Sequence, residues 1–338
     1  MFRVDGGWFR GIDSWWCVMT LILVRASERY VTQSVDRLIT TVKGEEIDPR
    51  SNKSIVYACG DGIISIAYTG IAFLGGIPTD QWLVEQITQR KFDRARKPAA
   101  MGLGQDWQPA EDLGQTILRI RTALDNATNC VPLHWKDAWR RETFDLIAAG
   151  WRWNKRNRVR PIIVTVSKAS GEEGFSVGYH RRFWHFRESR GSPFVLYSAP
   201  ITNYSRRDME QFHPRITNRD WQESEALMVE EIRRVAADNP QVGKHVLTVT
   251  LSPPRDAQCV ISDHPAAPIL QPIRSVFASH LKAEVHLAPW LVGKGLIQPP
   301  ALLSHTQRVQ LGRYSLTLLA PNKPGPTFFG SLQRPKLR

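Results

Sequence analysis

The stretch "TLILVRASERYVTQSVDRLIT", residues 20–40, contains two short runs rich in apolar and β-branched residues. The runs at 20–25 and 30–35 flank the polar segment 26–29. Two such runs around a short polar segment predict an antiparallel β-hairpin. Met19 directly precedes Thr20 at the head of the first run, and Asp36 follows the second run. The hairpin therefore carries a hydroxyl at its beginning and a carboxyl group at its end.

A second hairpin is expected from "SIVYACGDGIISIAYTG", residues 54–70, because the Gly-rich "CGDG" is a tight-turn signal between two β-rich runs. Residues 78–90 predict a helix with Thr79 or Asp80 as its N-cap, and apolar residues at helical spacing predict another over 110–127. The later expected elements are strands at 143–153, 160–168, 174–186, 244–252, 283–288 and 314–320, and a helix at 221–239.

Strands followed by helices, and then by strands again, argue against alternating β-α units. The order predicts an α+β fold in which two antiparallel sheets pack together with helices outside each, as a four-layer αββα sandwich. We expect residues 1–18 to be a leader or a mis-assigned start. Residues 19–252 form the expected domain, 253–320 a β-rich C-terminal extension, and 321–338 a basic flexible tail.

Composition indicates the kind of partner and the cellular compartment of the chain more than its function. The 338 residues carry a net charge of +13, which favours acidic partners or surfaces. The four cysteines are scattered without a CxxC pair, as expected for reduced thiols in a cytoplasmic protein. The longest apolar run, 15–24, is about half of what a membrane-spanning helix needs, so no membrane association is expected. No HxH or HExxH pair occurs among the histidines, and the sequence predicts neither a metal site nor a cofactor.

Four features resemble proteasome β-subunits and their bacterial relatives, which are N-terminal-nucleophile (Ntn) hydrolases. They are Thr20 before the first strand, "SVDR" (34–37) closing the second, "NKS" (52–54) opening the third, and "YTG" (68–70) ending the fourth. The motifs cover residues 19–90, and over 140–250 only the order of elements is similar.

The resemblance implies a site in which Thr20 is the nucleophile, Asp36 the orienting acid, Lys53 the cation and the Gly70 amide the donor to the oxyanion. A threonine hydroxyl needs a base, and a free α-amine on the same residue, with a pKa of about 7.7–8.0, can serve as one. Lys53 lies one residue later than the family spacing, which a loop adjustment can absorb.

The implied function is that of an N-terminal-threonine amidohydrolase or peptidase, which forms an acyl-enzyme on Thr20 from a peptide or amide substrate. The resemblance also implies a homo-oligomer. Family members that remove a propeptide have glycine before the nucleophile, whereas this chain has Met19. Either translation begins at Met19 and the methionine is trimmed, or Thr20 stays internal and the protein is inactive.

Two other functions stay open. The first is a catalytically inactive structural or binding protein on the same fold, which predicts that Thr20, Asp36 and Lys53 do not converge. Taken singly, Asp36 then pairs with Arg37 or caps a turn, Lys53 is a solvated loop lysine, and Gly70 serves only a turn with positive φ. The second is a basic nucleic-acid-associated protein, because residues 151–219 contain 14 Lys and Arg against 5 Asp and Glu. Within that segment, "YHRRFWHFRESR" (179–190) interleaves aromatic rings with arginines, a composition suited to single-stranded nucleic acid.

Overall fold

The structure is a computed structural model of the chain, in which the described residues lie between 17 and 319. The described residues are 17–18, 20–40, 45–48, 51–74, 76–92, 111–131, 136–153, 159–179, 186–187, 193–198, 204, 206–254, 256, 258–266, 270–272, 282–284, 286–294, 296–303, 306–311 and 314–319. The expected basic tail at 321–338 lies outside them, as does nearly all of the expected leader.

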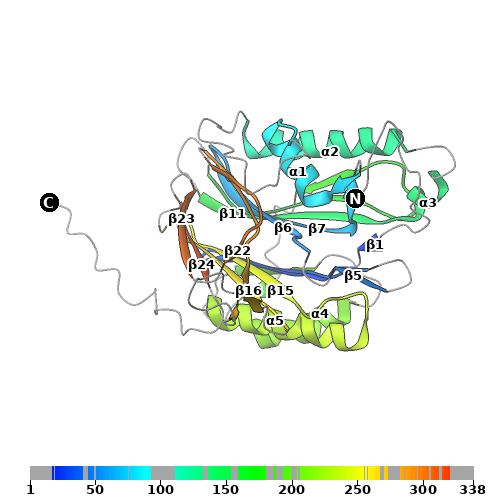
Figure 1. Cartoon of the computed structure of the whole chain (residues 1–338). Coiled ribbons are helices and arrows are strands. Elements are labelled where there is room, and N and C mark those ends of the chain that lie inside the picture. The colour runs from blue at the N-terminus through cyan, green and yellow to red at the C-terminus, as the bar shows by residue number, and fades with distance from the viewer. Residues whose placement is uncertain are drawn as a thin grey trace.

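Two sheets of eight strands each form the body of the molecule (Figure 1). The first sheet carries the second hairpin of the sequence at its centre. Its strands are, in order, β12 (Ser176–Tyr179), β11 (Val159–Lys168), β10 (Phe144–Trp153), β7 (Gly62–Ile71), β6 (Ser54–Ala58), β20 (Trp290–Gly293) and β21 (Leu296–Gln298), with β1 (Cys17–Val18) also paired to β7.

The second sheet carries the first hairpin at its centre. Its strands are β13 (Phe186–Arg187), β14 (Pro193–Ser198), β2 (Ile22–Ser27), β3 (Val31–Asp36), β15 (Val246–Leu251), β16 (Gln258–His264), β24 (Tyr314–Leu319) and β23 (Gln307–Leu311). Neighbouring strands are antiparallel except in the pairs β6–β20 and β16–β24. Both parallel pairs use strands from the last third of the chain, which therefore extends both sheets.

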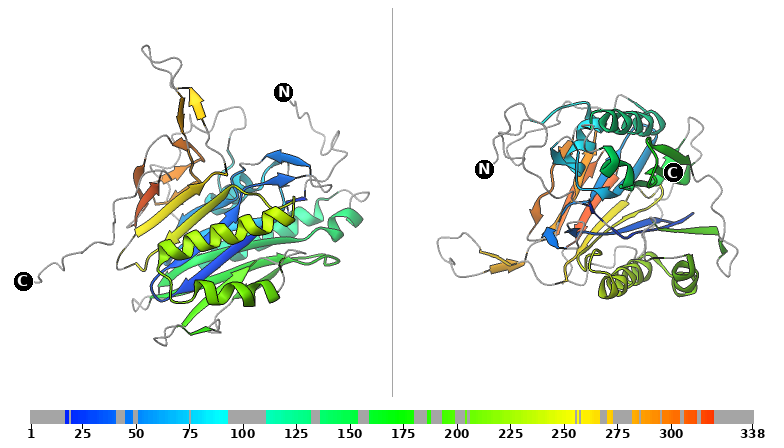
Figure 2. Two further views of the ribbon diagram at one scale, coloured as in Figure 1. Left: turned by 90° about the horizontal axis from the view of Figure 1, so that it is seen from below. Right: turned by 90° about the vertical axis from the view of Figure 1, so that its right-hand side faces the viewer.

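Helices cover the outer face of each sheet (Figure 1). The helices α1 (Thr79–Thr88) and α2 (Leu113–Asn129) lie on the first sheet, and α4 (Arg206–Ile216) and α5 (Trp221–Asp238) lie on the second. A short helix, α3 (Lys136–Arg141), precedes β10. Four small two-stranded pairs complete the described part: β4 (Ile39–Thr40) with β5 (Glu46–Asp48), β8 (Phe73–Leu74) with β9 (Ile77–Pro78), β17 (Leu270–Pro272) with β18 (Lys282–Glu284), and β19 (His286–Leu287) with β22 (Leu302–Leu303). The β17–β18 pair stands away from the two large sheets (Figure 2).

Strand β7 explains why the apolar runs of the sequence are nearly continuous. Successive side chains of a strand point to opposite faces. Ile64 and Ile66 of β7 pack in the cluster shared with α1 and α2, whereas Ile63 and Ala67 pack in the cluster between the two sheets. A third cluster joins the second sheet to α4 and α5. Because both faces of the sheet are covered, both sets of side chains have to be apolar.

The α+β class and both hairpins are confirmed. Ile22 of β2 pairs with Val35 of β3, and Ser54 of β6 pairs with Ala67 of β7. The helix predicted at 221–239 is α5, which begins at a capping box in which Asp220 and Glu223 bond to each other's backbone amides.

One local prediction was wrong, and two helices were not predicted. The N-cap of α1 is Pro78, and the Thr79 hydroxyl instead donates to the carbonyl oxygen of Ile71. Helix α4 lies in a segment whose arginine-rich composition gave no helix prediction. It shows that packing of a few apolar side chains such as Phe212 and Ile216 against a sheet outweighs a polar composition. Helix α3 was also not predicted.

None of the described helices combines the length and the apolar character needed to cross a membrane.

Candidate active site

Thr20 lies two residues before β2, where the two sheets face each other, and its side chain is fully buried. Its Oγ1 atom is 2.5 Å from the Nζ atom of Lys53, which donates to it. Its backbone N–H donates to Oγ1 of Thr69 at 2.9 Å. The hydroxyl and the nitrogen of Thr20 are therefore each held by a side chain from the first sheet or its approach.

Asp36 ends β3, and the antiparallel pairing of β2 with β3 brings it beside Thr20. Its Oδ2 atom accepts the N–H of Leu21 at 2.6 Å. Its Oδ1 atom accepts the N–H groups of Leu38 at 3.0 Å and Gly243 at 3.2 Å. Three backbone amides thus fix the carboxyl group before any side chain is considered.

Lys53 lies directly before β6, is fully buried, and bonds to both Thr20 and Asp36. Its Nζ atom is 3.3 Å from Oδ1 of Asp36 and also donates to the carbonyl oxygen of Leu38. The expectation of a solvated loop lysine is wrong, because Lys53 is fully buried and its ammonium bonds to Thr20, Asp36 and the carbonyl oxygen of Leu38. The structure therefore brings Thr20, Asp36 and Lys53 together in one buried cluster.

Burial governs the protonation of this cluster. Burial lowers the pKa of Lys53 to about 8, although the Asp36 carboxylate acts to raise it. Burial also raises the pKa of Asp36 above its usual value, while the Lys53 ammonium and the three amide donors act in the opposite direction. A lysine whose pKa lies near 8 can exchange a proton at physiological pH.

Gly70 is the penultimate residue of β7 and adopts a φ of +103°. A Cβ atom built on it would lie 2.0 Å from the carbonyl oxygen of Thr143, so a side chain is excluded. The position is within a strand and not in a turn. Val18 of β1 is its partner across the strand edge.

Two residues of the cluster were missed from the sequence. Thr69, which binds the nitrogen of Thr20, directly precedes Gly70 in the "YTG" motif, so the motif itself was the available signal. Gly243 had no such signal, since 207 residues separate it from Asp36. A Cβ atom on Gly243 would lie 2.6 Å from Cβ of Leu38, so only glycine lets its amide reach the carboxyl group.

A second buried network of hydrogen bonds fixes Asn52, the residue directly before Lys53. Asp80, in the first turn of α1, accepts hydrogen bonds on Oδ2 from Nδ2 of Asn52 and Nε1 of Trp290, both at 2.9 Å. Burial raises the pKa of Asp80, and these two hydrogen bonds act in the opposite direction. Asn52 is the neighbour of Lys53 in the chain. Trp290 begins β20, so a strand from the C-terminal part of the chain contacts Asp80, which also binds Asn52 beside Lys53.

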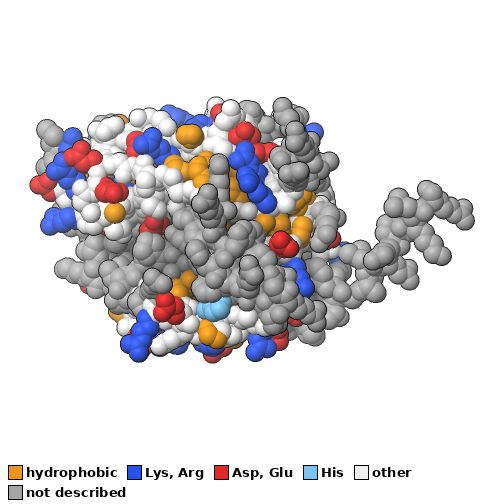
Figure 3. All heavy atoms as spheres, turned by 180° about the vertical axis from the view of Figure 1, so that it is seen from behind, with side chains coloured by type: hydrophobic (Ala, Val, Ile, Leu, Met, Phe, Trp, Pro, Cys, Tyr) orange, Lys and Arg blue, Asp and Glu red, His pale blue; other side chains and the backbone are white. Residues whose placement is uncertain are grey.

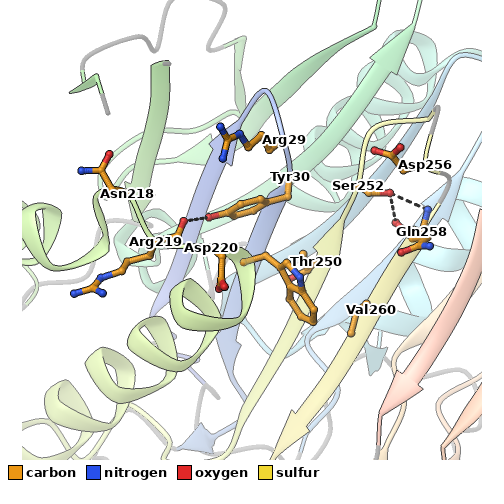
Figure 4. A pocket seen from close by; sticks show the side chains of 11 residues that line it. Arg29, Tyr30, Asn218, Arg219, Asp220, Thr250, Ser252, Asp256, Gln258 and Val260 are labelled. Atoms are coloured by element: carbon orange, nitrogen blue, oxygen red, sulfur yellow. Dashed lines mark hydrogen bonds between the residues drawn. The ribbon is translucent and has the colours of Figure 1, made fainter. Parts of the chain in front are cut away.

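A pocket of about 300 Å³ lies at the other end of β2, past the tip of the first hairpin (Figure 4). Arg29, Tyr30, Arg219 and Asp220 are among its lining residues, and none of the four predicted site residues lines it. The Tyr30 hydroxyl donates to the carbonyl oxygen of Arg219, which closes one side of the pocket. The pocket is therefore separate from the cluster around Thr20.

Two further expectations concern metal ligands and a basic surface among the described residues. No group of three or more His, Cys, Asp or Glu side chains that could hold a metal ion occurs among them. Most of the aromatic and arginine-rich segment 179–190 lies outside the described residues. On the described part of the face in Figure 3, basic and acidic side chains are interspersed.

Comparison with known proteins gives only a distant likeness. No family model matches the chain. No curated protein matches it either. Three similar solved structures are Anbu proteins: the Gly-1 mutant from Hyphomicrobium sp. strain MC1 (12% identity, 70% of this chain and 83% of that one, TM-score 0.44), Anbu from the same strain in another crystal form (12%, 69% and 82%, 0.42), and Anbu, described as an ancestral beta-subunit, from Yersinia bercovieri (9%, 69% and 82%, 0.40).

These findings correct one prediction. Membership of the chain in the proteasome β-subunit family of Ntn hydrolases is wrong as predicted, because no family model matches and the three solved structures named above reach TM-scores of only 0.40–0.44 at 9–12% identity. The arguments that follow rest on the residues of this chain.

Proposed function

We propose that the protein is an N-terminal-threonine amidohydrolase that cleaves a peptide or amide bond through an acyl-enzyme on Thr20. The observation that carries the proposal is the contact of 2.5 Å between Oγ1 of Thr20 and Nζ of Lys53, in a buried cluster with Asp36. In this proposal the two sheets and their outer helices are the layers of a four-layer αββα sandwich, and the site lies between the sheets.

The first step requires a base for the Thr20 hydroxyl. The sequence predicts the α-amine as this base and Lys53 as a cation. The contact with Oγ1 and a pKa of about 8 instead favour Lys53 as the acceptor. Neutral Lys53 takes the hydroxyl proton, the oxygen attacks the substrate carbonyl carbon, and Asp36 steadies the resulting ammonium.

The carbonyl oxygen gains negative charge in this step and needs a hydrogen-bond donor. Gly70 follows Thr69, whose side chain binds the nitrogen of Thr20, so the Gly70 amide is the neighbouring backbone donor on β7. A single aimed donor of this kind contributes about 3 kcal/mol in comparable reactions.

The α-amine of Thr20 completes the proton transfers. As an ammonium it gives a proton to the leaving nitrogen, which departs as an amine and leaves the acyl ester on Thr20. As a neutral amine it then takes a proton from water, and the hydroxide attacks the ester. Lys53 returns its proton to Oγ1, so the products are an acid and an amine and the site is regenerated.

Release of the residues before Thr20 is part of the proposal for two reasons. It frees the nitrogen that is otherwise held in a peptide bond. It also uncovers the edge of β7, because Cys17 and Val18 pair with Ile71 and Gly70 there. An acyl substrate that reaches the Gly70 amide needs this edge free.

The decisive experiment determines the N-terminus of the purified protein by mass spectrometry. A chain that begins at Thr20 is expected, together with labelling of Thr20 by electrophilic threonine-directed inhibitors. Thr20→Ala is expected to abolish labelling, while Thr20→Ser, which keeps a hydroxyl, is expected to retain part of it. A leader intact in every molecule would reject the proposal.

An inactive binding protein is the second candidate, and the pairing of β1 with β7 is the observation that favours it. In such a protein, the segment before Thr20 would stay in place as a permanent strand. Intact protein mass and failure of inhibitor labelling would then occur together. Self-association, a cytoplasmic location, the domain bounds and nucleic-acid binding stay predictions.

A further inference from the structure

Two polar side chains interrupt the apolar inner face of the first sheet near Thr20. Thr69 on β7 and Asp145 on β10 are direct partners in the antiparallel register, so their side chains share one face. That face is the one between the sheets, because Ala67 and Ile147, two residues away on each strand, belong to the inter-sheet cluster. Thr69 and Asp145 are each only 5% exposed.

Asp145 is a buried carboxyl group that, within the described part of the chain, forms no ion pair with a Lys, Arg or His. Ser167, its register neighbour on β11, is the side chain that bonds to it among the described residues. Burial raises the pKa of Asp145, and the hydrogen bond from Ser167 acts in the opposite direction. A buried carboxyl group is costly unless a charge or several donors compensate it, so the position calls for a cation.

The nitrogen of Thr20 is the group that can supply this cation. It already donates to Oγ1 of Thr69 at 2.9 Å, and Asp145 lies directly opposite Thr69. In a strand pair the Cβ atoms of such partners are about 5 Å apart. Once the peptide bond before Thr20 is cut, the nitrogen becomes an ammonium that faces this pair of side chains.

We infer that Thr69 and Asp145 form the binding site of the Thr20 α-amine. The Thr69 hydroxyl accepts one N–H of the amine, and the Asp145 carboxylate balances its positive charge. The inference rests on the proposed function, because it requires a free amine at Thr20. Thr69 touches the reacting nitrogen, whereas Asp145 acts through Thr69 and through its charge, and is a positioning residue.

The arrangement orients the amine for both of its proton transfers. With one N–H fixed by Thr69, the remaining positions of the nitrogen turn toward the substrate and its own Oγ1. Among the described residues, Lys53, on the approach to β6, and Asp36, at the end of β3, are the charged groups that bond to Thr20 or its neighbour Leu21, while Asp48 and Arg37 act on Lys53 from farther away. Lys53 as an ammonium disfavours a second cation, so Asp145 is needed to keep the α-ammonium available to the leaving group.

The test measures the pKa of the α-amine directly in the chain that begins at Thr20. Competitive labelling with acetic anhydride across pH, followed by mass spectrometry of the N-terminal peptide, gives its midpoint without any hydrolysis assay. Asp145→Asn is expected to lower the midpoint by about one pH unit or more, as for loss of an opposite charge nearby. Thr69→Val removes the hydroxyl that accepts from the nitrogen and is expected to move the midpoint of α-amine labelling away from the wild-type value. Thr69→Ser keeps a hydroxyl and is expected to restore the midpoint.

Asp61→Asn is the matched control. Asp61 precedes β7 at the end far from Thr69, about 27 Å away along the strand, and should leave the midpoint unchanged. An unchanged midpoint in folded Asp145→Asn protein would overturn this inference and leave the hydrolase proposal standing. A shifted midpoint in protein that shows neither hydrolysis nor inhibitor labelling would support this inference and reject the hydrolase proposal. An uncut leader would reject both.

Discussion

The Nζ atom of Lys53 lies 2.5 Å from the Oγ1 atom of Thr20, although 33 residues separate the two in the chain. Thr20 leads into β2 of the second sheet and Lys53 into β6 of the first. The contact exists because the two hairpins meet face to face with their open ends at the same side. Asp36, at the end of the first hairpin, then lies within reach of the same ammonium at 3.3 Å.

Replacement of Lys53 by methionine should remove the proton acceptor while keeping an apolar stem of similar length. We expect the rate of Thr20 acylation to fall by about 10²- to 10⁴-fold, the usual contribution of a general base. The rate is measured with an electrophilic inhibitor by mass spectrometry. Lys168 is a matched control, since it is also buried and donates to carbonyl oxygens, those of Trp139, Arg140 and Glu142, outside the site. Equal losses in Lys53→Met and Lys168→Met, corrected for folded fraction, would contradict the role of Lys53.

The pH dependence of acylation should follow Lys53. Only the neutral amine accepts the Thr20 proton, and burial sets the pKa of Lys53 at about 8. The labelling rate should therefore rise with pH up to about 8 and decline about tenfold per unit below it. A stopped-time labelling series from pH 6 to 9 measures this limb. In Lys53→Arg the limb should vanish, because a guanidinium stays protonated throughout; persistence of the limb would assign it to another group.

Asp36→Asn should destabilise the fold strongly. The substitution leaves the Lys53 ammonium buried without its counter-charge, and breaking a buried pair in this way costs about 3–5 kcal/mol. Urea unfolding measures the change. Addition of Lys53→Met to Asp36→Asn should recover part of the loss, because the stranded charge is removed as well. Glu173→Gln, which breaks an exposed ion pair with Arg140, should change the free energy of unfolding by about 1 kcal/mol or less.

Gly70→Ala should be destabilising for a steric reason that does not depend on catalysis. The new methyl group would meet the carbonyl oxygen of Thr143 at 2.0 Å in a backbone with φ of +103°. Thermal unfolding should show a large decrease in midpoint. Gly60→Ala is the control, since no atom lies within 4 Å of the position that its Cβ atom would take and its φ is not positive. A Gly70→Ala protein as stable as Gly60→Ala would mean that β7 and β10 separate more easily than their register implies.

Local pattern was sufficient for the elements that run close together in the sequence. Apolar, β-rich runs around short polar or glycine-rich turns gave the hairpins 22–36 and 54–71, and apolar residues at helical spacing gave α5. Asp36 and Lys53 were identified through the resemblance of "SVDR" and "NKS" to motifs of proteasome β-subunits, and not from the strand pattern itself. Helix α4 and strand β20 gave no comparable signal, because their stability comes from the sheet against which they pack, whereas β24 was predicted as a strand at 314–320.

The sequence by itself determined the first two hairpins and the helices α1, α2 and α5, and that a hydroxyl, an acid and a lysine stand at the ends of those hairpins. Only the tertiary structure decided that these three groups meet in one buried cluster, that Gly243 donates to Asp36 across 207 residues, and that Asp145 lies opposite Thr69, whose hydroxyl accepts the N–H of Thr20. The reason is physical: period and turn chemistry act between near neighbours, whereas burial of charge depends on how two separately formed sheets are packed together.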